Sequence, residues 1–262
     1  MARKIKTVLI DLSGTLHVDD NVIPGAVEAL KRLRETGAFI RFVTNTTKES
    51  QKLLHDRLKK LGFVIAKDEI FSSLQAARQV LISRQLNPLL LIDDAAVEDF
   101  TDLSKEGQLN AVVVGLAPSK FHYNQLNTAF RLLLEGSSLI ALHEGRYYKC
   151  SDGLALGPGA FVKGLEYSAN VKAEIIGKPT ADFFLTALGE TKPEEAVMIG
   201  DDVKDDVAGA QAVGIKGILV KTGKYLAGDE DMILPPPYKV CSSFVEAIEL
   251  QITLPVEGNI FI

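Results

Sequence analysis

The chain has 262 residues, of which 47% are hydrophobic and 24% charged, with a formal net charge of −5. This composition is typical of a globular protein, and the length allows one large α/β unit or a core that carries an insertion. The small negative charge and the lack of a basic cluster argue against nucleic acid as the main partner. No run approaches 18 consecutive apolar residues, so we expect no membrane-spanning helix and no membrane partner.

The cysteines and the amino-terminal segment bear on location. Cys150 and Cys241 are far apart and are not part of a metal-binding or redox motif. Residues 1–6 lead directly into a short strand rather than into the long apolar segment of a signal peptide. We therefore expect a reduced, cytoplasmic protein.

In the first part of the chain, short apolar runs alternate with amphipathic stretches, which is typical of βαβ units and a parallel sheet. We expect a helix between Pro24-Gly25 and Gly37, and a second helix at residues 50–61. The second helix is expected to place four leucines on one face: Leu53, Leu54, Leu58 and Leu61. The remaining elements expected here are strands at residues 7–10, 39–43 and 70–72 and a helix at residues 74–86.

The middle of the chain repeats this alternation and can form a small sheet of its own. The expected strands are at residues 89–92, 111–115, 139–143 and 173–176, and the expected helices are at residues 123–134 and 160–169. A loop rich in glycine and proline is expected at residues 152–159. We interpret residues 78–177 as an inserted domain.

The last part returns to the pattern of the first. Strands are expected at residues 196–199 and 217–220, and helices at residues 181–188, 205–213 and 244–252. The hydroxyl of Ser242 is expected to cap the last helix.

Asp11 is the most informative residue, because it follows a buried strand and precedes a Gly-Thr turn. Ligands of open α/β sheets bind at the carboxyl ends of the strands. Lys178 lies between Gly177 and Pro179, and it supplies a compact cation of the kind that holds phosphate. An aspartate before glycine can also bind only its own backbone, and Lys178 can be an ordinary surface lysine.

Four carboxylates follow the strand at residues 196–199: Asp201, Asp202, Asp205 and Asp206. One or two of them can serve only as helix caps. Four carboxylates within six positions repel one another, however, and a cation relieves this repulsion most simply. Hard oxygen ligands with room for water suit Mg²⁺. A carboxylate nucleophile, a lysine and an acidic cluster together indicate metal-assisted phosphoryl transfer through an aspartyl-phosphate.

Other polar residues carry weaker signals. Thr44 and Asn45 end the second strand of the core, where they can bind phosphate oxygens or simply begin a helix. His17 can face the site, but we leave it out of the mechanism. The loop at residues 153–159 lacks the Lys-Ser/Thr of a nucleotide-binding loop, so the sequence does not support ATP binding.

These motifs, in this order, resemble those of the haloacid dehalogenase superfamily of phosphohydrolases. The resemblance covers the whole chain, and the insertion resembles the α/β cap of one subgroup. It rests on four motifs: Asp11-Leu12-Ser13-Gly14-Thr15, Thr44-Asn45, Lys178, and Gly200-Asp201-Asp202 with Asp206. The fold class expected is α/β, with a Rossmann-like, doubly wound parallel-sheet core at residues 1–77 and 178–262 and an inserted α/β cap domain at residues 78–177.

The resemblance implies a role for each matching residue. Asp11 would be the catalytic nucleophile and a Mg²⁺ ligand, Ser13 would bind the metal through its backbone carbonyl, and Asp201 would be the third protein ligand. Asp202 and Asp206 would orient the shell of the ion. The residues placed around the substrate phosphoryl group are Asp11, Leu12, Ser13, Thr44, Asn45 and Lys178.

Ser13 departs from the superfamily pattern. Most members have an aspartate at this position that protonates the leaving group and then deprotonates the hydrolytic water. A serine hydroxyl cannot do this near neutral pH. The missing acid matters most for alkoxide leaving groups and least for phosphate or a protonated nitrogen.

We therefore expect a Mg²⁺-dependent phosphatase that acts on a small phosphorylated substrate with an easily expelled leaving group. The alternative is a catalytically weak phosphate-binding or scaffold protein, in which Ser13 marks lost chemistry. A receiver-type phospho-acceptor domain is excluded, because it would be about half as long and would have its acidic pair after the first strand. By analogy with the family, a homodimer through the cap is expected.

Overall fold

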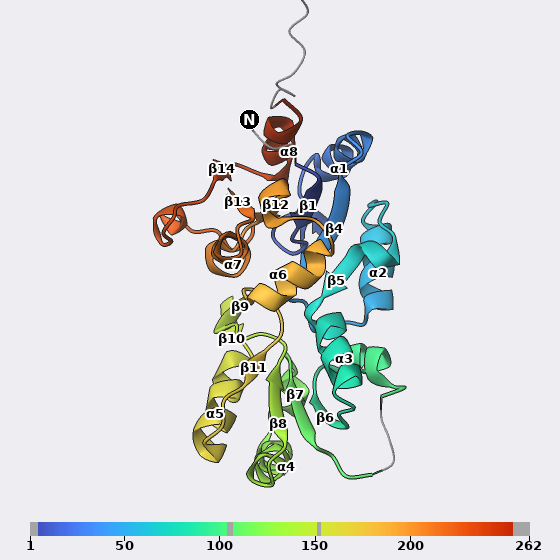
Figure 1. Ribbon diagram of the computed structural model, residues 1–262, viewed down its shortest axis with the longest axis vertical. Coiled ribbons are helices and arrows are strands. Elements are labelled where there is room, and N and C mark those ends of the chain that lie inside the picture. Colours follow the sequence, from blue (N-terminus) through green and yellow to red (C-terminus); the bar gives the residue numbers. More distant parts are fainter. Residues whose placement is uncertain (1–4, 104–106, 151–152, 254–262) are drawn as a thin grey trace, which may run out of the picture. The chain divides into compact units, whose positions relative to one another are not determined.

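The computed structural model describes residues 5–103, 107–150 and 153–253, which divide into two compact units (Figure 1). The first unit is built from the described parts of Met1–Thr44, Arg57–Phe71 and Lys178–Ile262. The second is built from Asn45–Asp56 and the described parts of Ser72–Gly177. The second unit is therefore inserted into the chain of the first.

The first unit contains a six-stranded sheet with the order β14-β13-β12-β1-β4-β5. The strands paired from β14 through β4 run parallel. The central strand β1 is fully buried, as its uninterrupted apolar sequence predicts for a parallel strand covered on both faces. The strand bounds are β1 Thr7–Ile10, β4 Phe39–Thr44, β5 Ile70–Ser72, β12 Ala196–Gly200, β13 Lys216–Val220 and β14 Lys239–Cys241.

Helices cover both faces of this sheet. α1 (Ala26–Glu35) packs against α8 (Phe244–Thr253) on one face, and α6 (Ala181–Leu188) packs against α7 (Gly209–Ala212) on the other (Figure 1). The residues of α1 that face the core follow helical spacing: Ala26, Ala29, Leu30 and Leu33. A π-helical turn, η5 (Val203–Ala208), leads into α7. A short hairpin of β2 (His17–Val18) and β3 (Asn21–Val22) follows β1.

The second unit has its own parallel sheet, with the strand order β11-β8-β7-β6. The strands are β6 Pro88–Leu91, β7 Ala111–Val114, β8 Ser138–Ala141 and β11 Glu174–Ile175, and an antiparallel hairpin is formed by β9 Tyr147–Cys150 and β10 Gly153–Leu156. The helices are α3 Ser73–Ser83, α4 Tyr123–Leu134 and α5 Gly159–Ala169. Val112, Leu133 and Val162 are among the side chains of its buried core. α2 (Gln51–Lys60) begins in this unit and ends in the first.

Short helical turns connect several of these elements. They are η1 Lys67–Glu69, η2 Asp94–Phe100, η3 Pro118–Lys120, η4 Pro193–Glu195 and η6 Asp229–Asp231.

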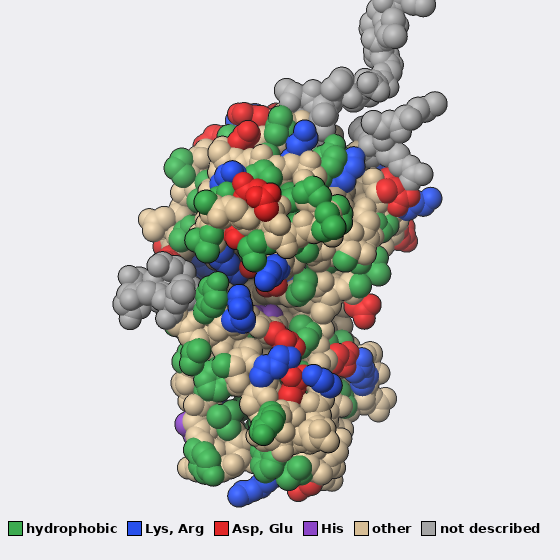
Figure 2. Space-filling view, turned by 90° about the vertical axis from the view of Figure 1, so that its left-hand side faces the viewer, with side chains coloured by type: hydrophobic (Ala, Val, Ile, Leu, Met, Phe, Trp, Pro, Cys, Tyr) green, Lys and Arg blue, Asp and Glu red, His purple; other side chains and the backbone are tan. Residues whose placement is uncertain are grey.

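None of the described helices is both long enough and apolar enough to cross a membrane. On the face shown in Figure 2, basic and acidic side chains lie interspersed.

The predicted fold class is confirmed: a parallel-sheet core of the Rossmann type carries an inserted α/β unit. Four local predictions were wrong. Gly153–Leu156 forms strand β10 rather than a loop, and Asp152, where that loop was expected to begin, lies outside the described residues. Leu53 is exposed instead of facing the core with Leu54 and Leu58.

The other two errors concern helices near the carboxyl end. Only Gly209–Ala212 of the helix expected at residues 205–213 is α-helical, because the turn before it is wound more loosely. The Ser242 hydroxyl donates to the Glu246 carboxylate at 2.6 Å, and Glu246 also accepts from the Ser242 backbone N–H. The helix begins at Phe244 and the Ala247 N–H donates to the Ser243 carbonyl, so Ser242 lies one residue before the N-cap position.

Candidate active site

Two aspartates meet at the carboxyl edge of the core sheet. Asp11 directly follows β1 and Asp201 directly follows β12, and these two strands are parallel neighbours with Ile10 opposite Ile199. The Asp11 backbone N–H donates to the Ile199 carbonyl at 2.9 Å, which fixes the first residue beyond the strand. Both carboxylates are buried. The sequence prediction that Asp11 and Asp201 lie at the ligand-binding edge of the sheet agrees with this placement.

Lys178 joins this pair to a third aspartate. Its ammonium Nζ donates to Asp11 Oδ1 and to Asp206 Oδ1, each at 2.5 Å, and to the Val43 carbonyl in β4 at 3.2 Å. The Lys178 side chain is only 3% exposed. A buried ammonium needs such partners, because removing a charge from water costs several kcal/mol unless opposite charges compensate it. Lys178 is therefore a component of the carboxylate cluster and not a surface lysine.

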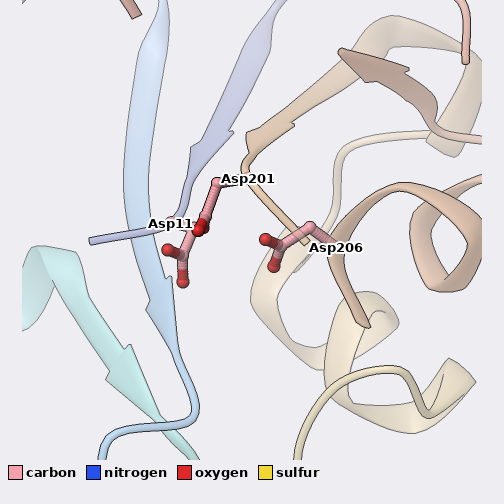
Figure 3. Close-up of side chains that lie close together, drawn as sticks. All are labelled: Asp11, Asp201 and Asp206. Carbon is pink, nitrogen blue, oxygen red and sulfur yellow. The ribbon is translucent and has the colours of Figure 1, made fainter. Parts of the chain in front are cut away.

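The turn η5 positions Asp206. The Asp206 backbone N–H donates to the Asp202 carbonyl at 3.0 Å, and Asp206 Oδ2 accepts from the Asp202 N–H at 3.1 Å. Asp202 itself caps the turn, because its Oδ1 accepts from the backbone N–H groups of Lys204 and Asp205 at 3.0 and 2.9 Å. Figure 3 shows the carboxylates of Asp11, Asp201 and Asp206 close together, the first two from strand ends and the third from this turn.

The cluster has the donor set of a site for a hard divalent cation. Asp11, Asp201 and Asp206 each offer one carboxylate oxygen, and these three atoms lie within 4.8 Å of one another. The cluster and its immediate neighbours carry five carboxylates (Asp11, Asp201, Asp202, Asp205 and Asp206) against two ammonium groups (Lys178 and Lys224). With every group ionised, three negative charges remain. Buried oxygen ligands with excess negative charge fit Mg²⁺ or a similar ion.

The pKa values of the cluster express the same excess of negative charge. Burial, with the nearby Asp11, raises the pKa of Asp201 to about 7, and burial, with the nearby Asp202, raises the pKa of Asp205 to about 6. Burial also raises the pKa of Asp206 well above its usual range despite the attraction of Lys178. Burial lowers the pKa of Lys178, but the charges of Asp11 and Asp206 outweigh it, so this pKa lies above its usual range.

The remaining predicted residues lie in different settings. Thr44 ends β4, the strand beside β1, and is buried, whereas Asn45 is grouped with the second unit. The Leu12 side chain is buried in the core, so any contact of Leu12 with a substrate would come from its backbone. Ser13 is exposed and forms an isolated bridge with His17. The assigned roles of these four residues stay predictions.

Sequence reasoning missed Thr222, Gly223 and Lys224. The Lys224 N–H donates to Asp201 Oδ2 at 2.7 Å, and the Lys224 ammonium lies 3.2 Å from Asp202 Oδ2. The signal was available, because polar residues follow the predicted strand at residues 217–220 just as Asp11 and Asp201 follow theirs. Parallel neighbouring strands bring such residues to one edge.

Comparison with protein families and relatives gives a consistent assignment. Residues 8–104 match a family model described as haloacid dehalogenase-like hydrolase, and residues 175–247 match one described as HAD-hydrolase-like. The chain is 59% identical over 249 residues to haloacid dehalogenase-like hydrolase domain-containing protein 2 of Mus musculus, covering 94% of this chain and 96% of the relative. It is 42% identical over 236 residues to phospholysine phosphohistidine inorganic pyrophosphate phosphatase of Danio rerio, covering 87% of each.

Solved structures show the same architecture. A 4-nitrophenylphosphatase from Thermotoga maritima matches with a TM-score of 0.84 and 26% identity, covering 94% of this chain and 97% of that one. A p-nitrophenyl phosphatase from Archaeoglobus fulgidus matches with a TM-score of 0.85 and 26% identity, covering 94% and 99%. The similarity therefore extends over both the core and the inserted unit.

Proposed function

This chain belongs to the haloacid dehalogenase-like hydrolases and is a hydrolase of that type, and we propose that it is a Mg²⁺-dependent phosphatase that forms an aspartyl-phosphate on Asp11. One observation carries the proposal. The buried Lys178 ammonium bridges Asp11 and Asp206 at 2.5 Å, while an oxygen of Asp201 lies within 4.8 Å of oxygens of both carboxylates. This arrangement provides a carboxylate nucleophile, a cation for phosphate charge and a donor set for a metal ion.

The reaction proceeds in two displacements at phosphorus. A carboxylate oxygen of Asp11 forms a bond to phosphorus, and the bond to the leaving group breaks, with its electron pair departing on that group. Water then attacks phosphorus, which releases inorganic phosphate, restores the Asp11 carboxylate and frees a proton. Lys178 compensates the charge that develops on the phosphoryl oxygens. When bound, Mg²⁺ supplies positive charge that reduces the repulsion between the carboxylates and the phosphate.

Ser13 supports a preference for leaving groups that need no proton from the enzyme. Its hydroxyl cannot act as a general acid near neutral pH, and such an acid is typically worth about 10²–10⁴-fold in rate. The name of the Danio rerio relative includes phospholysine, phosphohistidine and inorganic pyrophosphate, whose leaving groups are a nitrogen or a phosphate. We propose that this chain acts on the same class of substrate.

Three further points belong to this proposal. Residues 78–177 act as the cap that selects the substrate, the protein forms a homodimer through this cap, and it works in the cytoplasm. The α/β organisation of the inserted unit supports the first point. The second and third rest on family analogy and on the sequence expectations above.

The test is turnover of pyrophosphate and p-nitrophenyl phosphate with and without Mg²⁺. We expect wild-type activity that is lost with excess chelator and lost in Asp11→Asn, because that variant lacks the nucleophile and one metal ligand. Asp182→Asn serves as the matched control, since Asp182 is exposed at the start of α6, and we expect it to keep full activity. An Asp11→Asn variant that keeps more than a few per cent of activity contradicts the mechanism. A wild type that binds phosphate without turnover supports the phosphate-binding alternative.

A further inference from the structure

A short segment after β13 contacts both the turn that follows Asp11 and the Asp201 carboxylate. β13 pairs with β12 in parallel, with Leu219 opposite Gly200, so residues 221–224 leave the sheet at the edge where Asp201 lies. The Thr222 hydroxyl donates to the Gly14 carbonyl at 2.5 Å. Two residues later, the Lys224 N–H donates to Asp201 Oδ2 at 2.7 Å. Residues 222–224 therefore connect two parts of the candidate metal site.

Two glycines allow these segments to approach closely. Gly14 and Gly223 have φ angles of 97° and 58°, which side-chain-bearing residues rarely adopt. A Cβ atom on either glycine would overlap the Asp201 carboxylate, and a Cβ on Gly223 would also overlap the Cα of Gly14. The Asp201 carboxylate is thus packed between two stretches of backbone, and a shift in either stretch displaces it.

The hydrogen bond from Lys224 also orients the Asp201 carboxylate. Asp201 Oδ2 accepts the Lys224 N–H at 2.7 Å, which fixes the position of one of the two carboxylate oxygens. Groups that hydrogen-bond a ligating carboxylate fix its orientation and commonly change metal affinity by 10- to 100-fold when removed. Thr222 acts on Asp201 indirectly. Its hydroxyl holds the Gly14 turn, and Gly223 packs against that turn.

We propose that Thr222, Gly223 and the Lys224 backbone are a positioning element for Asp201 and for the turn after Asp11, and that they set the affinity of the carboxylate cluster for a divalent cation. This inference rests on the proposed function, in which Asp11 and Asp201 hold Mg²⁺. Thr222 is a positioning residue, since its hydroxyl acts on the Gly14 carbonyl and through it on the turn after Asp11. Its side chain offers the clearest test, because valine removes the hydroxyl at nearly constant volume.

The experiment measures the Mg²⁺ dissociation constant by isothermal titration calorimetry without substrate. We expect Thr222→Val to weaken Mg²⁺ binding about tenfold and Thr222→Ser, which keeps the hydroxyl, to bind almost as the wild type does. Thr191→Val is the matched control, because Thr191 shares a 2.8 Å hydroxyl–hydroxyl hydrogen bond with Thr7, the first residue of β1, at the opposite end of that strand. This control should leave Mg²⁺ binding unchanged.

Unfolding by urea in excess chelator separates a positioning role from a structural one. Thr222→Val and Thr191→Val should lose similar, small amounts of stability, and only Thr222→Val should lose metal affinity. If Thr222→Val does not fold, Thr222→Ala, which also removes the hydroxyl, replaces it, and the expected result is again weakened Mg²⁺ binding.

A folded Thr222→Val that binds Mg²⁺ as the wild type does overturns the inference and leaves the proposed function intact, provided that Asp201→Asn loses the metal. A wild type that binds no Mg²⁺ overturns both.

Discussion

Removing the Lys178 ammonium should destabilise the metal-free protein strongly, because it leaves two buried carboxylates without their cation. In the Lys178→Met variant the side chain stays unbranched, becomes one atom shorter and loses its charge. The wild-type Lys178 side chain is 3% exposed, and its Nζ lies 2.5 Å from both Asp11 Oδ1 and Asp206 Oδ1. Breaking a buried ion pair by removing one partner typically costs 3–5 kcal/mol, and here one substitution breaks two pairs. We therefore expect a loss of about 3–5 kcal/mol in the free energy of unfolding.

Lys163→Met provides the matched control. Lys163 also bridges two carboxylates, those of Glu144 and Glu166, each at 2.9 Å, but its side chain is 55% exposed. Water screens such a pair, and surface ion pairs contribute about 0–1 kcal/mol. The two variants therefore remove the same kind of interaction, a lysine between two carboxylates, from a buried lysine in Lys178→Met and from a solvent-exposed lysine in Lys163→Met.

The assay is urea unfolding of both variants in excess chelator and again with Mg²⁺. Mg²⁺ should restore part of the stability of Lys178→Met, because an ion that binds only the folded state stabilises it. In the turnover assay, kcat/KM of Lys178→Met should fall. We expect the fall to correspond to a loss of about 2–4 kcal/mol in transition-state stabilisation, as for other preorganised electrostatic groups. The reasoning is refuted if Lys178→Met and Lys163→Met unfold at similar urea concentrations without Mg²⁺.

Three further outcomes are expected. A general acid typically raises the rate by about 10²–10⁴-fold, and Ser13→Asp should raise turnover of alkyl phosphates by part of that factor, with little gain on p-nitrophenyl phosphate. Equal gains on both substrates would contradict the role assigned to Ser13. Burial raises the pKa of Asp201 to about 7 in the folded protein, so the fold favours the protonated form of this carboxyl. The free energy of unfolding of the metal-free protein is therefore highest at low pH and falls as pH rises through 7, by up to roughly 4 kcal/mol. Melting curves at pH 5 and pH 8 in excess chelator should show part of this loss in the wild type and a smaller loss in Asp201→Asn, in which Asp205 and Asp206 still have raised pKa values, whereas equal losses in the two proteins would rule it out. Ca²⁺ should inhibit, because its larger and looser coordination misplaces the carboxylates, and a rate equal to that with Mg²⁺ would argue against the metal assignment.

The sequence was sufficient to predict the parts of the site that lie at strand ends. The apolar runs at residues 7–10 and 196–199 are unambiguous, and the residues that directly follow them are carboxylates. Parallel pairing then requires Asp11 and Asp201 to lie at one edge, as they do. Lys178 was different, because nothing in its local sequence distinguishes a buried cation from a surface one. Its contacts with Asp11 and Asp206 span 167 and 28 residues, so the sequence suggested a phosphate-binding cation without predicting that this cation is buried between these two carboxylates.

Elements that depend on long-range contacts were missed. β14 has only three residues and one buried side chain, so its sequence carries almost no periodic signal. The exposure of Leu53 depends on which neighbours pack against α2, and helical spacing alone does not specify them. Thr222 and Gly223 were missed because a hydroxyl and a glycine look like an ordinary turn until the Gly14 carbonyl and the Asp201 carboxylate are placed beside them.

The central claim is that Asp11 is the nucleophile, and trapping its phosphorylated form tests it most directly. Enzyme mixed with p-nitrophenyl phosphate and Mg²⁺ is quenched in acid within one turnover, reduced with borohydride and analysed by peptide mass spectrometry. Borohydride reduces an aspartyl-phosphate to homoserine, so we predict homoserine at position 11 in the wild type. We predict an unmodified residue 11 when Mg²⁺ is omitted. Release of p-nitrophenol with Asp11 unmodified, or with the phosphate trapped on another residue, would contradict the account.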